Sequence, residues 1–251
     1  MRLYVPDIEL DTCACSEQVE QVKLCIGFGP IKKKKVKKYH SGFLDTNTFI
    51  MEEDGHLLII DPADYADVLE KCRNAASVTV LLTHEHFDHI SGLNRIRALC
   101  ASSCRVIAGA TCSERIQDEK GNLSAYADVL AELGGKQIPK HWSPFACKAA
   151  DITFENPYAF RWMGHAVEMF SAPGHSAGSC CIVVDDMLFV GDTVLENNLM
   201  VKFPGSSKKL YRSVAAPLLE KWLQGNRISC VYPGHGDVMS PEMTVGLIRG
   251  V

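Results

Sequence analysis

The stretch THEHFDHISG, residues 83–92, gathers side chains of the kinds that bind metal ions. It contains His84, His86, Asp88 and His89, although the whole chain has only 9 histidines. On a helix, His84 and His86 would project about 200° apart and could not share a ligand. The zinc-protease pattern H-E-x-x-H also fails, because Asp88 stands where its second histidine is needed. In an extended segment residues two apart share a face, so we expect His84, His86 and Asp88 to converge from one strand-like turn.

The elements around this stretch indicate where it lies in the fold. Before it, the β-branched run Val78–Leu82 predicts a buried strand. After it, Leu93, Ile96 and Leu99 recur at helical spacing, with Ser91 as the expected N-cap. The stretch therefore falls on a strand-to-helix loop, and ligands of α/β folds bind at the carboxyl ends of strands.

Three further apolar runs end in a side chain that can bind a metal. VEMFSAPG leads to His175, MLFVG to Asp192 and ISCVYPG to His235, much as VTVLLT leads to His84. A glycine directly precedes His175, Asp192 and His235, so the backbone there can turn sharply and approach another group closely. One such residue alone would be an ordinary turn residue. Four in one chain, beside a histidine-rich stretch, predict a metal site.

The number of candidate ligands favours two ions over one. Five histidines and two aspartates exceed the three or four protein groups that one tetrahedral zinc uses. They suit two divalent ions that share a bridging carboxylate, and Asp192 is the best bridge because its two oxygens can bind different ions. A mixed nitrogen and oxygen set without sulfur suits zinc, iron or manganese, of which we expect zinc. The candidate ligands are His84, His86, Asp88, His89, His175, Asp192 and His235.

The remaining sequence predicts strands and helices of a single domain that spans residues 1–251. Residues 43–62 indicate a hairpin with its turn at Asp54-Gly55, and a short helix follows at Tyr65–Cys72. Three strands are expected in quick succession between residues 165 and 192. Residues 208–222 predict an amphipathic helix, capped by Ser206 or Ser207, whose apolar face consists of Leu210, Val214, Leu218 and Trp222.

Two segments allow more than one interpretation. Residues 1–42 are expected to add N-terminal strands, and the run Lys32–Lys38 within them indicates either nucleic-acid binding or an exposed edge strand protected by lysine. We favour the edge strand. Residues 112–150 are helix-like and polar, and they form either an insertion that covers the active site or an ordinary crossover connection.

Composition argues against several classes of protein. A formal net charge of −4 does not suit a general nucleic-acid binder, so we expect a small-molecule substrate. The 11 cysteines include the adjacent pair Cys180-Cys181, which suits no disulfide framework, so we expect reduced thiols and a cytoplasmic location. The first residues lack the apolar region of a signal peptide, and no apolar run approaches the ~18 residues of a membrane span.

The ordered motifs HEHFDH after Thr83, PGHSAGS, GDT and PGHG resemble those of the metallo-β-lactamase-fold hydrolase superfamily, over residues 47–235. The resemblance implies a four-layer αββα sandwich of two mixed β-sheets, with the metals between the tops of the sheets. It implies one metal held by His84, His86 and His175, and another held by Asp88, His89 and His235, with Asp192 as the bridge. It also assigns to Asp61 the acid that supports the histidine-rich loop through hydrogen bonds.

Departures from the motifs of individual branches indicate which branch of this superfamily the sequence resembles least. The commonest zinc β-lactamases carry cysteine where Asp192 stands, so we do not expect antibiotic hydrolysis. Iron flavoproteins of this fold carry glutamate at the position of His86. Glyoxalase II is the closest motif match, but its C-terminal helical segment binds glutathione, and few residues follow His235. We therefore expect a glyoxalase II-like site without that helical domain.

The favoured function is a binuclear hydrolase of a small ester-like substrate: a thioester, a lactone or a phosphodiester. Two ions lower the pKa of a bridging water to about 7, which supplies hydroxide at neutral pH. Asp88 could orient that hydroxide or return a proton to the leaving group, so Asp88 and Asp192 are the expected catalytic residues. Lys202, Lys208 and Tyr211 are candidates to line the mouth and bind an anionic substrate group, or else they lie on a solvated helix face.

Three other functions remain open at this point. The first is a mononuclear iron dioxygenase that acts on persulfides, since some superfamily members use a subset of the same ligands for this reaction. The second is a nucleic-acid-processing nuclease, for which Lys32–Lys38 is the only support. The third is a purely structural metal protein, which fits poorly because structural sites are closed whereas this ligand set leaves open positions.

Overall fold

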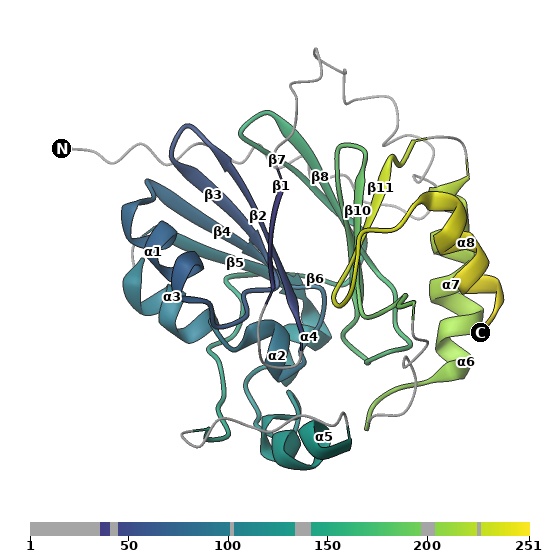
Figure 1. Cartoon of the computed structure of the whole chain (residues 1–251), viewed down its shortest axis with the longest axis horizontal. Coiled ribbons are helices and arrows are strands. Elements are labelled where there is room, and N and C mark those ends of the chain that lie inside the picture. Colours follow the sequence, from purple (N-terminus) through teal and green to yellow (C-terminus); the bar gives the residue numbers. More distant parts are fainter. Residues whose placement is uncertain (1–35, 41–44, 101–102, 134–141, 197–203, 225–226) are drawn as a thin grey trace.

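The computed structural model describes residues 36–40, 45–100, 103–133, 142–196, 204–224 and 227–251 (Figure 1). Lys32–Lys35, Lys202 and residues 134–141 of the predicted insertion lie outside the described residues, as does most of the predicted N-terminal extension. Two sheets face each other, and helices cover the outer face of each, so the predicted αββα sandwich is confirmed.

Within the described residues, the first sheet has six strands in the order β1-β2-β3-β4-β5-β6. Pairing is antiparallel from β1 to β3 and parallel from β3 to β6, so the sheet is mixed. The strands are β1 (Val36–His40), β2 (Asn47–Glu53), β3 (His56–Ile60), β4 (Ser77–Leu81), β5 (Cys104–Gly109) and β6 (Ile152–Phe154).

The second sheet has five strands in the order β11-β10-β9-β8-β7 in the same part of the chain. Its pairs are antiparallel except for β10 with β11, which run parallel. The strands are β7 (Tyr158–Trp162), β8 (His165–Ser171), β9 (Cys180–Val184), β10 (Met187–Gly191) and β11 (Cys230–Pro233).

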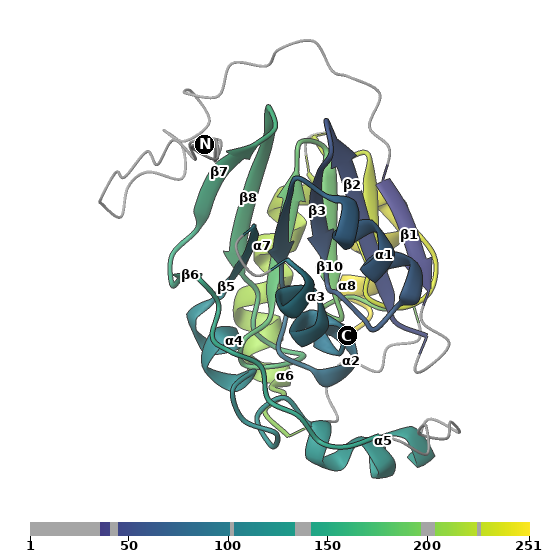
Figure 2. The same ribbon diagram turned by 90° about the vertical axis from the view of Figure 1, so that its left-hand side faces the viewer.

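The helices lie in two outer layers and at one end of the sheets (Figures 1 and 2). The first sheet is covered by α1 (Ala66–Asn74) and α3 (Leu93–Leu99). The second is covered by α6 (Lys208–Leu210), the π-helical turn η3 (Tyr211–Ala215), α7 (Ala216–Leu223) and α8 (Pro241–Arg249). The end of the sheets carries α2 (Phe87–Ile90), α4 (Ala110–Arg115), the 3-10 turn η2 (Ser124–Tyr126) and α5 (Ala127–Leu133).

Strand β3 shows why the central strands are apolar throughout. Leu57 and Ile59 pack in the layer beneath α1, whereas Leu58 and Ile60 pack in the layer between the two sheets. Successive side chains of a strand point to opposite faces, and both faces of this sheet are covered. The strand therefore needs an apolar residue at each of these positions.

Several local predictions are confirmed. The hairpin β2–β3 turns at Asp54 and Gly55, which both have positive φ (49° and 80°), as the tight turn of a hairpin requires. The predicted strand at Val78–Leu82 corresponds to β4, and the predicted helix at Tyr65–Cys72 corresponds to α1. The N-cap prediction for Ser91 is wrong, because Ser91 follows the last residue of α2 and Gly92 precedes α3.

The predicted apolar face of the helical region 208–223 is also wrong by one residue. Leu210 and Val214 are 41% and 40% exposed. The buried row consists instead of Tyr211, Ala215, Leu219 and Leu223. Both rows have four-residue spacing, so periodicity alone cannot choose between them. The predicted cap is confirmed, since the side chain of Ser207 accepts a hydrogen bond from the backbone N–H of Leu210.

The described part of the lysine run forms an edge strand, as favoured from the sequence. Strand β1 begins at Val36 and pairs only with β2 at the margin of the first sheet, within the described residues. Lys37 and Lys38 are exposed on it. Every cysteine of the described residues is a free thiol. None of the described helices has the length and apolar character that crossing a membrane would require.

Candidate metal centre

The histidine-rich loop leaves β4 and enters α2, and this bend divides its candidate ligands between two groups. Because α2 begins at Phe87, Asp88 lies on a helix, and the prediction that His84, His86 and Asp88 converge from one strand-like turn is wrong. His84 and His86 converge instead with His175, which follows β8; the candidate ligand atoms of these three lie within 4.8 Å of one another. We call this set the first cluster.

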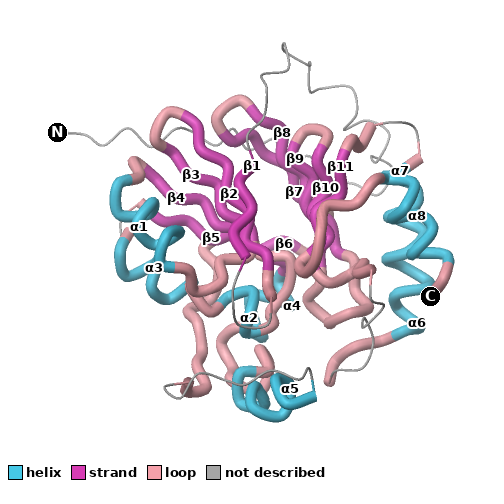
Figure 3. Tube along the Cα trace, viewed as in Figure 1, coloured by secondary structure: helices cyan, strands magenta, loops and turns pink. Residues whose placement is uncertain are grey.

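The second cluster consists of Asp88, His89 and His235, whose candidate ligand atoms also lie within 4.8 Å of one another. His235 comes from the loop after β11, so this cluster joins the two sheets. Figure 3 shows the loops gathered at the same end of both sheets. This is the end at which β4, β10 and β11 terminate, as expected for ligands at the carboxyl ends of strands.

Asp192, directly after β10, lies between the two clusters. Its Oδ2 is 3.6 Å from Nε2 of His175 in the first cluster and 3.3 Å from Nε2 of His235 in the second. Its Oδ1 is 3.4 Å from Nε2 of His89. One carboxylate therefore faces candidate ligands of both clusters, mainly through Oδ2, and its role as a bridge stays a prediction.

Asp61 holds a histidine in each cluster. Its carboxylate accepts hydrogen bonds from the backbone N–H of Thr83 (2.8 Å), from the Thr83 hydroxyl (2.5 Å) and from Nδ1 of His89 (3.0 Å). Since the Thr83 hydroxyl donates to Asp61, it accepts from Nδ1 of His84, 3.0 Å away. In His84 the proton is thereby held on Nδ1 and the lone pair of Nε2 faces the centre, whereas in His89 the Nδ1–H donates to Asp61 and Nε2 faces the centre.

The unsatisfied atoms of the centre fit a metal. Nε2 of His84 is buried and has no hydrogen-bond partner within the described residues. A buried polar atom without a partner is costly, and a bound ion would remove that cost. Nε2 of His175 and Nδ1 of His86 lie 2.9 Å apart, at hydrogen-bond distance, so these two rings of the first cluster face each other. These observations support metal binding by the centre.

The two clusters differ in their protonation. Burial, reinforced by the neighbouring histidines, lowers the pKa of His84 and His86 well below the usual range. Burial also acts to lower the pKa of His235, but the carboxylates of Asp192 and Asp88 outweigh it and raise that pKa to about 10. The carboxylates of Asp88 and Asp192 raise the pKa of His89 in the same way. His84 and His86 of the first cluster are therefore neutral imidazoles, whereas His89 and His235 of the second cluster are protonated in the metal-free protein.

The three glycines before ligand residues allow close approach, as predicted. A Cβ on Gly234 would lie 2.2 Å from Oδ1 of Asp192 and 2.6 Å from His89. A Cβ on Gly191, which also has a positive φ of 49°, would lie 2.3 Å from the Thr83 hydroxyl. A Cβ on Gly174 would meet Tyr211 at 2.6 Å. Each loop can pack against its neighbour only because this side chain is absent.

The sequence reasoning missed Glu85, which is buried beneath the first cluster. Its carboxylate accepts hydrogen bonds from Nε of Arg115 (2.7 Å) and from the hydroxyl of Ser176 (2.8 Å). The two interactions join the loop of His84 and His86 to the residue that follows His175. An acid between two metal-ligand positions could have signalled this, since a buried charge must find a partner.

The structure also identifies two residues at the start of β2 that no motif indicated. The hydroxyl of Thr46 donates to Oδ2 of Asp88 at 2.7 Å. The side chain of Asn47 donates to backbone carbonyls on both sides of His235. Both residues are fully buried. Neither carries a local sequence signal, because their partners lie far away in the chain.

The structure bears differently on the three residues predicted to contact the substrate, Lys202, Lys208 and Tyr211. Tyr211 has no exposed surface, and it packs against Gly174 beneath the loop of His175. The prediction that Tyr211 lines an open mouth is therefore wrong. Lys208 is exposed at the start of α6, and its contact with a substrate stays a prediction. Lys202 lies outside the described residues.

The predicted insertion 112–150 connects the parallel strands β5 and β6, as a crossover connection does. Its described part also packs against the metal loop. The ring of Trp142 lies 5.3 Å from that of Phe87, and Leu123 and Ala127 belong to the same apolar cluster. The backbone N–H of Phe87 donates to the carbonyl of Asn122. The segment therefore supports α2 from the side opposite the sheets.

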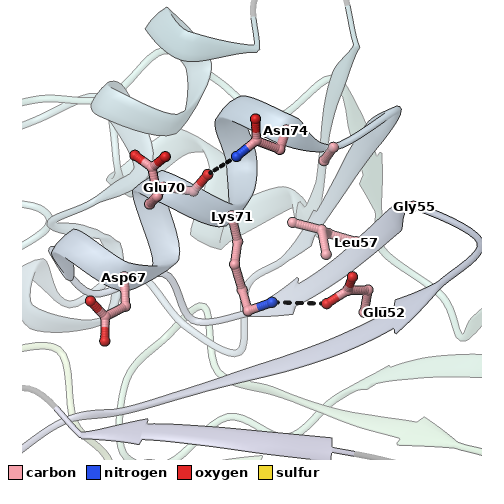
Figure 4. A pocket seen from close by; sticks show the side chains of 8 residues that line it. Glu52, Gly55, Leu57, Asp67, Glu70, Lys71 and Asn74 are labelled. Carbon is pink, nitrogen blue, oxygen red and sulfur yellow. Dashed lines mark hydrogen bonds and ion pairs between the residues drawn. The ribbon is translucent and has the colours of Figure 1, made fainter.

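A separate cavity of about 380 Å³ lies between α1 and the β2–β3 hairpin (Figure 4). It is lined by charged residues that include Glu52, Asp67 and Lys71, and Lys71 pairs with Glu52 at 2.8 Å. It contains none of the candidate metal ligands. The cavity and the metal centre are thus different places on the molecule.

The sequence profile of the metallo-beta-lactamase superfamily matches residues 41–235, and the chain belongs to this superfamily. The hydroxyacylglutathione hydrolase of Shewanella sp. (strain ANA-3) is 22% identical over 197 residues, which cover 76% of this chain and 63% of the relative. That of Klebsiella pneumoniae is 25% identical over 174 residues, covering 68% of this chain and 56% of the relative. The chain thus spans less than two thirds of the length of these relatives.

Solved structures agree on the fold. The BLEG-1 B3 metallo-beta-lactamase has a TM-score of 0.63 at 24% identity, over 83% of this chain and 95% of that one. TTHA1623, in a di-iron-bound form, has a TM-score of 0.61 at 22% identity, over 86% of this chain and 100% of that one. The fold that the motifs implied is therefore shared by proteins of low sequence identity.

Proposed function

We propose that the chain is a binuclear metal-dependent hydrolase of a small ester-like substrate. The observation that carries the proposal is the position of Asp192, with Oδ2 3.6 Å from a histidine of the first cluster and 3.3 Å from one of the second. A carboxylate between two triads of ligands is what a pair of ions needs as a bridge. A structural site would need closed coordination around a single ion.

The donor set divides accordingly. His84, His86 and His175 would hold one ion, and Asp88, His89 and His235 the other. Zinc suits this set, and iron and manganese also accept imidazole with carboxylate. The di-iron-bound form of TTHA1623 supports a two-ion centre on this fold. When bound, the ions would supply Lewis acidity and a water with a pKa of about 7.

The chain's own residues would then orient the reaction. Thr46 holds Oδ2 of Asp88, so the carboxylate cannot rotate freely. In the proposed reaction this carboxylate would take up a proton or return one to the leaving group. Asp61 fixes the histidines from behind. The side chain of His235 is 25% exposed, whereas those of His89 and His175 are almost fully buried, so the centre opens toward solvent on the side of the second cluster.

The relatives described as hydroxyacylglutathione hydrolases support a thioester, and lactones and phosphodiesters are the other members of the proposed substrate class. The test is a panel of these three ester types, assayed on protein whose metal content has been measured. We expect hydrolysis of at least one of them, and loss of that activity when a chelator removes the metal. Oxygen uptake with a persulfide and no hydrolysis of any panel member would instead identify an iron dioxygenase.

A further inference from the structure

The loop that carries His235 is held by hydrogen bonds from the opposite sheet. Asn47, the first residue of β2, donates from Nδ2 to the carbonyl oxygens of Pro233 (3.0 Å) and Gly236 (2.9 Å). The backbone N–H of Asn47 donates to the carbonyl of Gly234 (2.7 Å). One residue of the first sheet thus binds three carbonyls that surround a ligand of the second cluster.

Two neighbours of Asn47 reinforce the same contact. Nζ of Lys38, on the edge strand β1, also donates to the carbonyl of Gly236 at 3.0 Å. Thr46 forms an isolated antiparallel bridge with His235, and its hydroxyl donates to Asp88. Thr46 therefore contacts two of the three members of the second cluster, although it is not itself a candidate ligand.

The loop needs such support because its own backbone has few restraints. His235 stands between Gly234 and Gly236, and Gly236 has a positive φ of 77°. Glycine has the widest choice of backbone conformations, so ordering a Gly-His-Gly segment costs more conformational entropy than ordering most others. The buried amide of Asn47 supplies two fixed donors to this segment.

We propose that Asn47 is a positioning residue that determines the metal affinity of the second cluster. The inference rests on the proposed two-ion function. By holding the His235 loop against the first sheet, Asn47 keeps His235 in the place where it meets Asp88 and His89. The first cluster does not depend on this contact, because Glu85, Ser176 and Arg115 hold its loops instead.

The test compares Asn47→Asp with Asn94→Asp. The first substitution keeps the shape of the side chain but replaces the donor Nδ2 with an acceptor. Asn94 serves as an exposed control, because its amide also donates to a distant backbone carbonyl, that of Ala146 at 2.9 Å, away from the centre. Both variants are titrated with Zn²⁺ against a competing chelator, and the imidazole resonance of His235 is followed by NMR.

We expect Asn47→Asp to weaken Zn²⁺ binding at the second cluster, the second binding event of the titration, about 10- to 100-fold. This is the range found for residues that orient metal ligands. Binding at the first cluster, the first event, should stay unchanged. Asn94→Asp should leave both events unchanged. Wild-type affinity for both ions in Asn47→Asp would overturn the proposal, and so would equal weakening of both. If Asn47→Asp does not fold, Lys38→Met removes the second donor to Gly236 from an exposed strand, and a smaller loss confined to the second event is expected.

These results separate the inference from the proposed function. If the wild type binds two ions and hydrolyses no ester, the proposed reaction fails, while selective weakening in Asn47→Asp still supports the positioning role. If the wild type binds a single ion, the two-ion centre fails. The positioning role is then judged in the metal-free protein, where an unchanged His235 resonance in Asn47→Asp would overturn it.

Discussion

Metal binding at the two clusters should respond differently to pH. In the metal-free protein, the nearby carboxylates of Asp192 and Asp88 overcome the effect of burial and raise the pKa of His235 to about 10. Between pH 7 and pH 9 its imidazole is therefore protonated and must lose that proton to bind a metal. One displaced proton changes affinity about tenfold per pH unit. Affinity at the second cluster should thus rise about 100-fold over this range, or about 2.7 kcal/mol.

The first cluster supplies the internal comparison. Because burial lowers the pKa of His84 and His86, these imidazoles are already neutral at pH 7 and release no proton. Two variants isolate the clusters: His235→Ala leaves the first intact, and His86→Ala leaves the second. Each is titrated with Zn²⁺ against a chelator at pH 7, 8 and 9, with the chelator's own pH dependence subtracted. Equal slopes for the two variants, or a flat profile for His86→Ala, would refute the assigned protonation.

Three substitutions test other parts of the centre. Asp192→Asn should fold but bind fewer ions and lose at least about 100-fold of the hydrolytic activity. The reason is that an amide offers one neutral oxygen in place of a charged bridge. A wild-type rate would show that Asp192 does not bridge. Gly234→Ala places a Cβ 2.2 Å from Asp192 and should lower both thermal stability and metal content, whereas the control Gly246→Ala meets no atom within 4 Å and should lower neither. Glu85→Gln leaves Arg115 without its buried counter-charge and should lower the free energy of unfolding by about 2 kcal/mol, measured by urea denaturation. An unchanged midpoint of the urea unfolding transition would show that the pair contributes nothing.

Four of the candidate ligands were predictable because each follows an apolar strand. The four strand-like runs before His84, His175, Asp192 and His235 lead to side chains that the structure brings to the same end of both sheets. The glycines before three of them were informative for the same reason, since a missing Cβ is visible in the sequence and a close approach needs it. Strand ends and glycines are local signals.

The supporting residues could not be predicted because their partners are distant. The side chain of Asn47 reaches Gly236, 189 positions away, and that of Thr46 reaches Asp88, 42 positions away. No periodicity relates such pairs. The division of the ligands was missed for a different reason: the helix α2 begins inside the motif, so Asp88 turns away from His84 and His86 and faces His235.

The helical region after β10 shows a third kind of limit. Two adjacent rows of residues have the same spacing, and the sequence offered Leu210 and Val214 as readily as Tyr211 and Ala215. In the structure Tyr211 lies against Gly174, and the row that contains Tyr211 is the buried one. That contact depends on how the helix sits against the second sheet, which a pattern of spacing does not contain.

The central claim is that Asp192 joins two ions, and anomalous diffraction from metal-loaded crystals tests it most directly. We expect two anomalous peaks per chain on either side of the Asp192 carboxylate, one beside His84, His86 and His175 and the other beside Asp88, His89 and His235. Elemental analysis of the same protein should give about two ions per chain. A single peak beside the first cluster, with less than about one ion per chain after reconstitution with excess metal, would contradict the two-ion centre.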